Sequence, residues 1–329
     1  MTSFSALRLH KTDASPTPDC RIDTLTLEQL SAGDVVIRIA YSSLNYKDAL
    51  AYAGRGKIIR SFPRITGIDF VGHVESSHDA RFQAGDQVIV HGFGVGVEHD
   101  GGHAQYARVP ADWVMKLPEN MSLLDACSIG AAGYTAALSL HWMEQCGLTP
   151  EQGDIAITGA TGGVASLAID ILSHRGYQVC AITSKTTLTD YLMSLGAKQV
   201  QTVPDLSANR PLRSAQWAGA IDSVGGDILP WLLSTTQAEG VVTSFGNAAG
   251  SDLSTTVFPF ILRGVKLLGI NANSPLSLRE QVWHKLHTIY SPSKLHEIRH
   301  IISLADLPST MEAMLARETH GRFIVDMTL

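Results

Sequence analysis

The sequence of 329 residues contains only four cysteines, and none of them forms a C-x-x-C pair. Scattered cysteines of this kind exclude a dense disulfide framework and indicate a reducing compartment. Charged residues are also few, at 17% of the chain, and the formal net charge is −6. Because a nucleic-acid-binding protein needs a basic face, we expect no nucleic-acid partner.

Long hydrophobic runs are missing too. The longest segment without an acidic or basic residue, 126–143, contains two glycines together with Ser, Thr, His and Trp. This composition favours a buried helix over a membrane span. The N-terminal residues lack an apolar core of signal-peptide length. We therefore expect a cytoplasmic protein without a membrane partner.

The residues that are present indicate a packed α/β protein of two domains, with 45% hydrophobic residues. Up to about residue 125, short apolar runs separated by Gly, Pro and Asp predict a largely antiparallel or barrel-like β domain. From about residue 153, apolar strands alternate with helical segments, which predicts βαβ units and a parallel sheet. The tail lacks this alternation. We assign residues 1–125 and 273–329 to the first domain, and 126–272 to the second.

A glycine-rich turn follows the first strand of the second domain. The run "IAIT" leads into Gly159, Gly162 and Gly163, and a helix is predicted from near Val164. Glycine lets backbone N–H groups approach a phosphate, and a helix N-terminus adds partial positive charge. This arrangement is typical of dinucleotide binding. The alternative is a tight turn that binds nothing.

The next strand, "YQVCAIT", predicts which dinucleotide is bound. Folds that prefer NAD place Asp or Glu after this strand, where it accepts hydrogen bonds from the ribose. Here Thr183, Ser184 and Lys185 stand instead. Hydroxyl donors and a lysine suit a 2′-phosphate, so we predict NADPH over NADH. The alternative is a plain polar loop.

Longer motifs cover nearly the whole chain. They are "SSLNYKDALAYAGRGKIIRSFPRITGIDFVGHV", "GDQVIVHGFGVGVEHDGGHAQYARVP", "IGAAGYTAA", "VTSFGNA" and "TTVFPFILRGVKLLGI". They resemble the quinone oxidoreductase-like branch of the medium-chain dehydrogenase/reductase superfamily. Within that branch, "LNYKDALA", "GKIIR", "TGIDF" and "PFILR" closely resemble the acrylyl-CoA reductase (NADPH) subfamily. The resemblance implies a GroES-like β-rich catalytic domain and a Rossmann doubly wound parallel-sheet domain that binds NADPH.

Zinc enzymes of that superfamily bind their catalytic metal with a Cys, a "GHE" motif and another Cys. Here the "GHE" position reads Gly67, Ile68, Asp69, and isoleucine cannot bind a metal. Cys127 alone makes no site, and the sequence lacks four closely spaced cysteines. We therefore predict no zinc. His73, His91, His99 and His103 lack metal-binding spacing, and we expect them in loops or on the surface.

Reduction of an activated C=C bond suits a site of this kind. Hydride goes to the β-carbon, and hydrogen-bond donors stabilise the resulting enolate oxygen. The best polar cluster is "NYKD", and the resemblance implies that it lines the cleft near the nicotinamide. Tyr46 is a candidate to contact the cofactor, to donate to the enolate oxygen or to supply the proton, and Asn45 to orient substrate or cofactor. The alternative is that Tyr46 only packs against the nicotinamide.

The resemblance also implies further cofactor contacts. Residues Thr161, Gly162, Gly163 and Val164 would meet the pyrophosphate, Asn247 and Ile261 would lie near the nicotinamide, and Arg322 in "GRFIV" would reach the cofactor. From charge alone, a basic stretch suggests a handle for the phosphates of CoA. It contains Arg55, Lys57, Arg60 and Arg64. The alternative is a solvated loop.

Three functions follow. The first is NADPH-dependent reduction of acrylyl-CoA to propionyl-CoA, and the second is a broader quinone or enone reductase of the same fold. The third is a protein that binds NADPH without turnover. The strand "VKLLGIN" predicts an apolar sheet edge, which a homodimer would cover.

Overall fold

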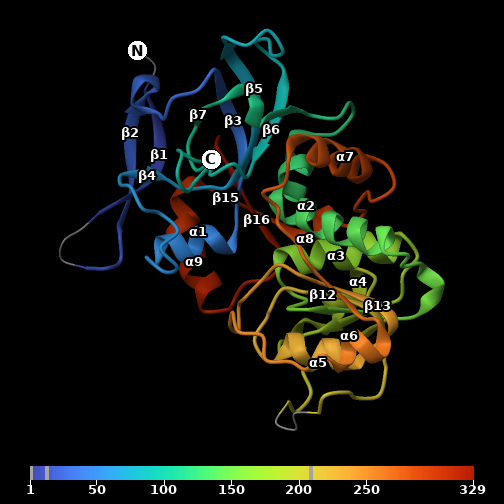
Figure 1. Cartoon of the computed structure of the whole chain (residues 1–329). Helices are drawn as coiled ribbons and strands as arrows, with labels where there is room; N and C mark the ends of the chain where they lie inside the picture. Colours follow the sequence, from blue (N-terminus) through green and yellow to red (C-terminus); the bar gives the residue numbers. More distant parts are fainter. Residues whose placement is uncertain (1–2, 12–14, 207–209) are drawn as a thin grey trace. The chain divides into compact units, whose positions relative to one another are not determined.

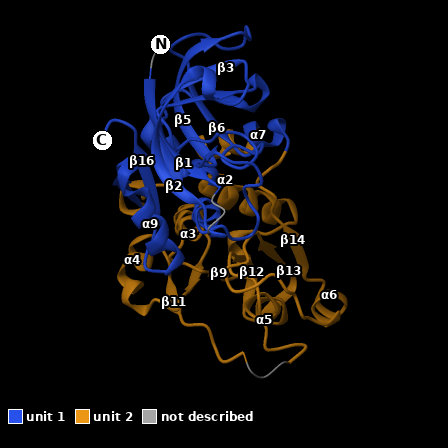
Figure 2. Ribbon diagram, turned by 90° about the vertical axis from the view of Figure 1, so that its left-hand side faces the viewer, with its two compact units in different colours: residues 1–131, 275–280, 299–329 blue, residues 132–274, 281–298 orange. Residues whose placement is uncertain are grey.

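The computed structural model describes residues 3–11, 15–206 and 210–329 (Figure 1). The chain divides into two compact units, coloured in Figure 2. Unit 1 comprises 1–131, 275–280 and 299–329, and unit 2 comprises 132–274 and 281–298.

Unit 1 is rich in β structure, as predicted. Its strands are β1 (Ser3–His10), β2 (Asp19–Thr26), β3 (Val35–Leu44), β4 (Arg64–Ile65), β5 (Asp69–Ser77), β6 (Gln87–His91), β7 (Tyr106–Val109), β8 (Val114–Lys116), β15 (Arg299–Ile302) and β16 (Arg322–Asp326). Its helices include α1 (Tyr46–Tyr52) and α9 (Leu307–Leu315). Val35, Ile37 and Ile39 of β3 alternate with more exposed residues, as in a strand with one buried face, whereas β5 and β6 bury consecutive residues.

The strands of unit 1 form two sheets. A three-stranded sheet has the order β2-β1-β4, and a seven-stranded sheet has the order β15-β16-β3-β5-β6-β8, with β7 also paired to β3. Except for the parallel pair β15–β16, the pairing is antiparallel. The C-terminal strand β16 lies between β15 and β3, so the last residues of the chain complete this sheet.

Unit 2 contains a six-stranded parallel sheet of order β11-β10-β9-β12-β13-β14. In chain order this is 3-2-1-4-5-6, the doubly wound Rossmann arrangement, and the predicted fold class is confirmed. The strands are β9 (Ile155–Thr158), β10 (Val179–Ile182), β11 (Gln199–Gln201), β12 (Trp217–Asp222), β13 (Thr236–Ser244) and β14 (Lys266–Gly269). The helices include α3 (Gly163–His174), α4 (Thr189–Ser194), α5 (Ile228–Thr235), α6 (Phe258–Arg263) and α8 (Leu295–Ile298).

Two helices carry the chain from unit 1 into unit 2. They are α2 (Leu123–Gln145), which is kinked at Gly130, and α7 (Leu276–His287). Within the described residues, α2 is the one helix long and apolar enough to cross a membrane, but 83% of its apolar window is buried inside the protein. It is a core helix, as the composition of 126–143 indicated.

The unit boundaries differ from the expected domain boundaries in three segments, 126–131, 273–274 and 281–298, of which the last is the longest. Residues 281–298 lie in unit 2, although the tail was assigned to the first domain as a whole. Hydrogen bonds within unit 2 explain the difference. Tyr290 OH donates to Glu144 at 2.6 Å, and Ser293 donates to Asp170 through its N–H at 2.9 Å and its hydroxyl at 2.8 Å.

Candidate functional site

The glycine turn of unit 2 connects β9 to the N-terminus of α3. Gly159 has φ +59°, and a Cβ there would lie 2.4 Å from Ser223 Oγ, so only glycine fits. Gly162 is exposed, and a Cβ there would meet only the Gly159 carbonyl within 4 Å. The first N–H groups of α3 have no acceptor inside the helix and carry partial positive charge. The turn therefore fits a pyrophosphate.

The other predicted cofactor residues of this unit follow strand ends at the same sheet edge. Ile182 pairs with Thr158, so 183–185 and the glycine turn follow neighbouring strands. Thr183 is buried and its hydroxyl accepts the Lys185 N–H at 3.0 Å, which leaves exposed Ser184 and half-buried Lys185 at the surface. Asn247 is exposed and follows β13.

Ile261 does not join this group. It lies on α6, whose last residue, Arg263, donates to the carbonyls of Ser234 at 3.0 Å and Thr236 at 3.1 Å. These carbonyls lie at the amino end of β13, whereas the glycine turn follows the carboxyl end of β9 in the same parallel sheet. The nicotinamide contact expected for Ile261 therefore stays a prediction that the strand ends do not support.

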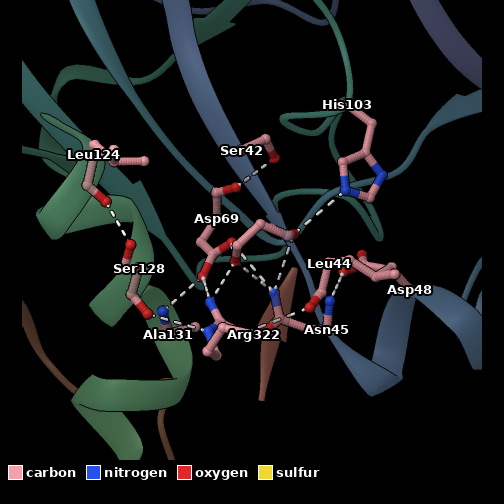
Figure 3. A network of polar contacts seen from close by, with 11 residues as sticks. Ser42, Leu44, Asn45, Asp48, Asp69, His103, Leu124, Ser128, Ala131 and Arg322 are labelled. Atoms are coloured by element: carbon pink, nitrogen blue, oxygen red, sulfur yellow. Dashed lines mark hydrogen bonds and ion pairs between the residues drawn. The ribbon is translucent and has the colours of Figure 1, made fainter. Parts of the chain in front are cut away.

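A buried ion pair lies at the centre of the candidate site in unit 1 (Figure 3). Arg322 Nη2 lies 3.8 Å from Asp69 Oδ2, and both side chains are almost fully buried. The guanidinium also donates to Ser43 Oγ at 2.6 Å and to the Ser128 carbonyl at 3.2 Å. The carboxylate accepts the Ala131 N–H at 2.6 Å and the Ser43 hydroxyl. A cofactor contact was expected for Arg322, but these donors face protein acceptors.

Asn45 connects this ion pair to helix α1. Its Nδ2 donates to Asp69 Oδ1 at 3.2 Å, and its Oδ1 accepts from Arg322 Nη1 at 3.0 Å. Orientation of substrate or cofactor by this carboxamide stays a prediction, and both of its ends contact the ion pair. Tyr46, the next residue, begins α1 and is 40% exposed.

Two more buried titratable groups, Asp48 and His103, adjoin this network. Asp48 accepts the N–H groups of Asn45 at 2.9 Å and Gly67 at 3.0 Å. Burial raises the pKa of Asp48 to about 7, and the nearby Asp69 acts in the same direction. His103 bonds Thr66 Oγ1 through Nδ1 at 2.7 Å, and its Nε2 lies 3.3 Å from the Ser43 carbonyl.

Of the four histidines expected in loops or on the surface, two are buried. They are His91 and His103. Burial lowers the pKa of His103 to about 4, so the ring is neutral and Nε2–H donates to the carbonyl. Among the described residues, no group of three or more His, Cys, Asp or Glu side chains is arranged to hold a metal ion.

Acid is expected to destabilise the fold through His103. Its pKa is about 4 in the folded state and 6.5 ordinarily, so the folded state binds fewer protons between these values. The stability from this residue is therefore complete above pH 6.5 and is lost as the pH falls toward 4. Lowering the pH from about 7 to about 5 should cost about 2 kcal/mol through His103. Urea unfolding of wild type and His103→Gln measures this, and identical pH dependence would contradict it.

The basic stretch is divided by the structure. Arg55, Lys57 and Arg60 are exposed. Arg64 is mostly buried and pairs with Asp100 at 3.1 Å, so its charge is neutralised by an ion pair within unit 1. We therefore leave Arg64 out of the proposed phosphate contacts.

Sequence reasoning missed the partners that hold Asn45. Asp69 was considered only as a lost zinc-motif position, and Gly130 was not singled out. A Cβ on Gly130 would lie 2.4 Å from Asp69 Oδ2. The available signals were a carboxylate at the start of an apolar strand and a glycine inside an apolar helix.

Comparisons with known proteins agree with this architecture. Residues 31–119 match the alcohol dehydrogenase GroES-like domain family. The acrylyl-CoA reductase AcuI of Ruegeria pomeroyi is 39% identical over 98% of this chain and 99% of its own length. YhfP of Bacillus subtilis, whose name describes a quinone oxidoreductase, is 42% identical over 99% of both chains.

Solved structures show the same likeness. The yhdH oxidoreductase of Salmonella enterica in complex with NADP has a TM-score of 0.95 and 42% identity, covering 98% of this chain and 99% of its own. The structure of Bacillus subtilis yhfP, with a TM-score of 0.95 and 43% identity over 99% of this chain and 100% of its own, has NAD bound. The chain is thus an oxidoreductase that belongs to the medium-chain dehydrogenase/reductase superfamily, in its quinone oxidoreductase-like branch.

Proposed function

We propose that this oxidoreductase uses NADPH to reduce the activated C=C bond of acrylyl-CoA, giving propionyl-CoA. The observation that carries the proposal is the glycine turn before α3, beside a strand end that offers Ser184 and Lys185 without an acid. AcuI, named an acrylyl-CoA reductase, and yhdH, solved with NADP, support it. The NAD bound to yhfP makes NADH the competing cofactor.

Different residues of this chain would bind the cofactor and act on the substrate. The pyrophosphate would lie against Thr161, Gly162, Gly163 and Val164, and the N–H groups of the last two, at the start of α3, would donate to it. Ser184 and Lys185 would bind the 2′-phosphate. NADPH supplies the hydride when bound. Tyr46 OH, on an exposed side chain, would donate to the enolate oxygen or protonate the α-carbon.

A substrate panel tests this function. Oxidation of NADPH, followed by absorbance, is measured with acrylyl-CoA, crotonyl-CoA, a small enone and a quinone. The highest kcat/KM with acrylyl-CoA is the expected result. A preference for the quinone would favour the broader reductase, which the name of YhfP supports. Tight NADPH binding without turnover of any of the four would indicate a non-catalytic binding protein.

Charge reversal at Lys57 and Arg60 is expected to raise KM for acrylyl-CoA about tenfold more than for the small enone, because only CoA carries phosphates. Both residues are exposed, so the fold should tolerate the change. Steady-state kinetics of Lys57→Glu/Arg60→Glu measures it. Exposed Arg38→Glu in the same unit is the control. Equal effects on both substrates would remove Lys57 and Arg60 from substrate binding.

We also propose a homodimer that covers one edge of the unit 2 sheet. Strand β14 ends the strand order, and apolar side chains before it are exposed. They are Val257, Phe258, Ile261 and Leu262. An unpaired apolar edge of this kind is usually covered. The molar mass in solution, one chain against two, tests the proposal.

A further inference from the structure

We propose that Asp69 and Arg322 are positioning residues, which fix the carboxamide of Asn45 and thereby hold Tyr46 at the start of α1. The inference rests on the proposed function, in which Tyr46 contacts the substrate. Its basis is the buried network of unit 1 (Figure 3).

Every nitrogen of the Arg322 guanidinium donates to an acceptor inside unit 1. Nε donates to the Ser128 carbonyl, and Nη1 donates to Asn45 Oδ1 at 3.0 Å and to the Leu44 carbonyl at 3.5 Å. Nη2 donates to Ser43 Oγ and faces Asp69. A guanidinium has five donors and no acceptor. These contacts direct the guanidinium toward residues of unit 1.

The ion pair also determines which way the Asn45 amide points. Arg322 can only donate, so it must face the amide oxygen, and the Asp69 oxygen accepts from the NH₂ group. A flipped amide would place donor against donor and acceptor against acceptor. The two charges therefore select one orientation of Asn45.

Three consecutive residues at the β3–α1 junction share this network. Ser43, Leu44 and Asn45 each bond to the ion pair, and Tyr46 follows directly. Arg322 reaches them because β16 pairs with β3, with Phe323 opposite Leu44. Movement of the pair would therefore move the residue before Tyr46.

Steady-state kinetics of Arg322→Lys and Asp69→Asn, alone and combined with Asn45→Ala, is the first test. Each single change should lower kcat about tenfold, because small misplacements of reacting groups are costly, and leave KM for NADPH within about threefold. In the Asn45→Ala background either change should add less than about twofold, because the pair acts through Asn45.

A second test needs no turnover. The chain has six asparagines, so ¹⁵N-asparagine labelling gives six side-chain NH₂ signals, and Asn45→Ala identifies that of Asn45. Arg322→Lys should shift this signal and speed its hydrogen exchange. Arg299→Lys, which alters a partly exposed pair with Asp125 in the same unit, is the matched control and should change neither signal nor kcat.

The outcomes distinguish a failure of the proposed function from a failure of the positioning role of Asp69 and Arg322. If wild type reduces none of the four substrates, the proposed function fails and the NMR test decides the positioning role alone. Loss of thermal stability with unchanged kcat and an unchanged Asn45 signal would overturn the inference. Equal losses of kcat in the wild-type and Asn45→Ala backgrounds would also overturn it. A rise in KM for NADPH as the main effect of Arg322→Lys would overturn it too, because it would indicate a cofactor contact.

Discussion

Replacing Lys185 with aspartate is expected to lower kcat/KM for NADPH by about a hundredfold and to leave that for NADH within about threefold. Lys185 follows β10, whose last residue pairs with the end of β9, directly before the glycine turn. A carboxylate there would repel the 2′-phosphate but would accept hydrogen bonds from the ribose hydroxyls of NADH. Steady-state kinetics with both cofactors measures the ratio.

Lys198→Asp is the matched control for this change. Lys198 is exposed in the same unit but precedes β11, at the amino edge of the parallel sheet. Lys198→Asp changes the net charge by the same amount as Lys185→Asp. It should leave the ratio of kcat/KM for NADPH to that for NADH unaltered. A fall of the same size for NADPH and NADH in Lys185→Asp would show that Lys185 does not recognise the 2′-phosphate.

Gly130→Ala should strongly destabilise unit 1. Gly130 has φ +49° and ψ −155°, a conformation nearly restricted to glycine. A Cβ would lie 2.4 Å from Asp69 Oδ2 and 2.9 Å from Arg322 Nη2. Backbone strain and a disturbed buried ion pair together predict a loss of about 3–5 kcal/mol.

Urea unfolding of Gly130→Ala beside Gly85→Ala separates the two causes. Gly85 also has positive φ, +92°, but a Cβ there would meet nothing within 4 Å. Its replacement should cost about 1–2 kcal/mol, from backbone strain alone. Similar losses in the two variants would mean that the side chain at 130 is accommodated without disturbing Asp69 and Arg322.

Local patterns in the sequence were sufficient for the Rossmann unit. Strands β9, β10 and β12 are short buried runs, and the turn after β9 has a distinctive glycine spacing. The placement of 281–298 was not predictable in this way, because it depends on bonds from Tyr290 and Ser293 to residues far away in the chain. Such contacts leave no periodic signal.

The candidate site was predicted in part. The "NYKD" segment was found because its polar residues cluster, and Asn45 does meet Arg322. Its surroundings were not found. Asp69 starts a strand, Gly130 interrupts a helix and Arg322 lies on the last strand, so no spacing links them. The burial that makes Asp69 and His103 important appears only when these elements pack together.

The place of β16 between β15 and β3 affects the order in which the two units can fold during synthesis. During synthesis the N-terminal strands leave the ribosome first, but the edge of β3 that receives 322–326 stays unpaired until β16 has been made. The strands of unit 2, which end at Gly269, are available earlier. Unit 1 therefore departs from the usual order in which N-terminal domains fold first. Removal of the final eight residues would deprive it of a strand and of Arg322, so nascent chains that stop short there should be substrates for chaperones and proteases.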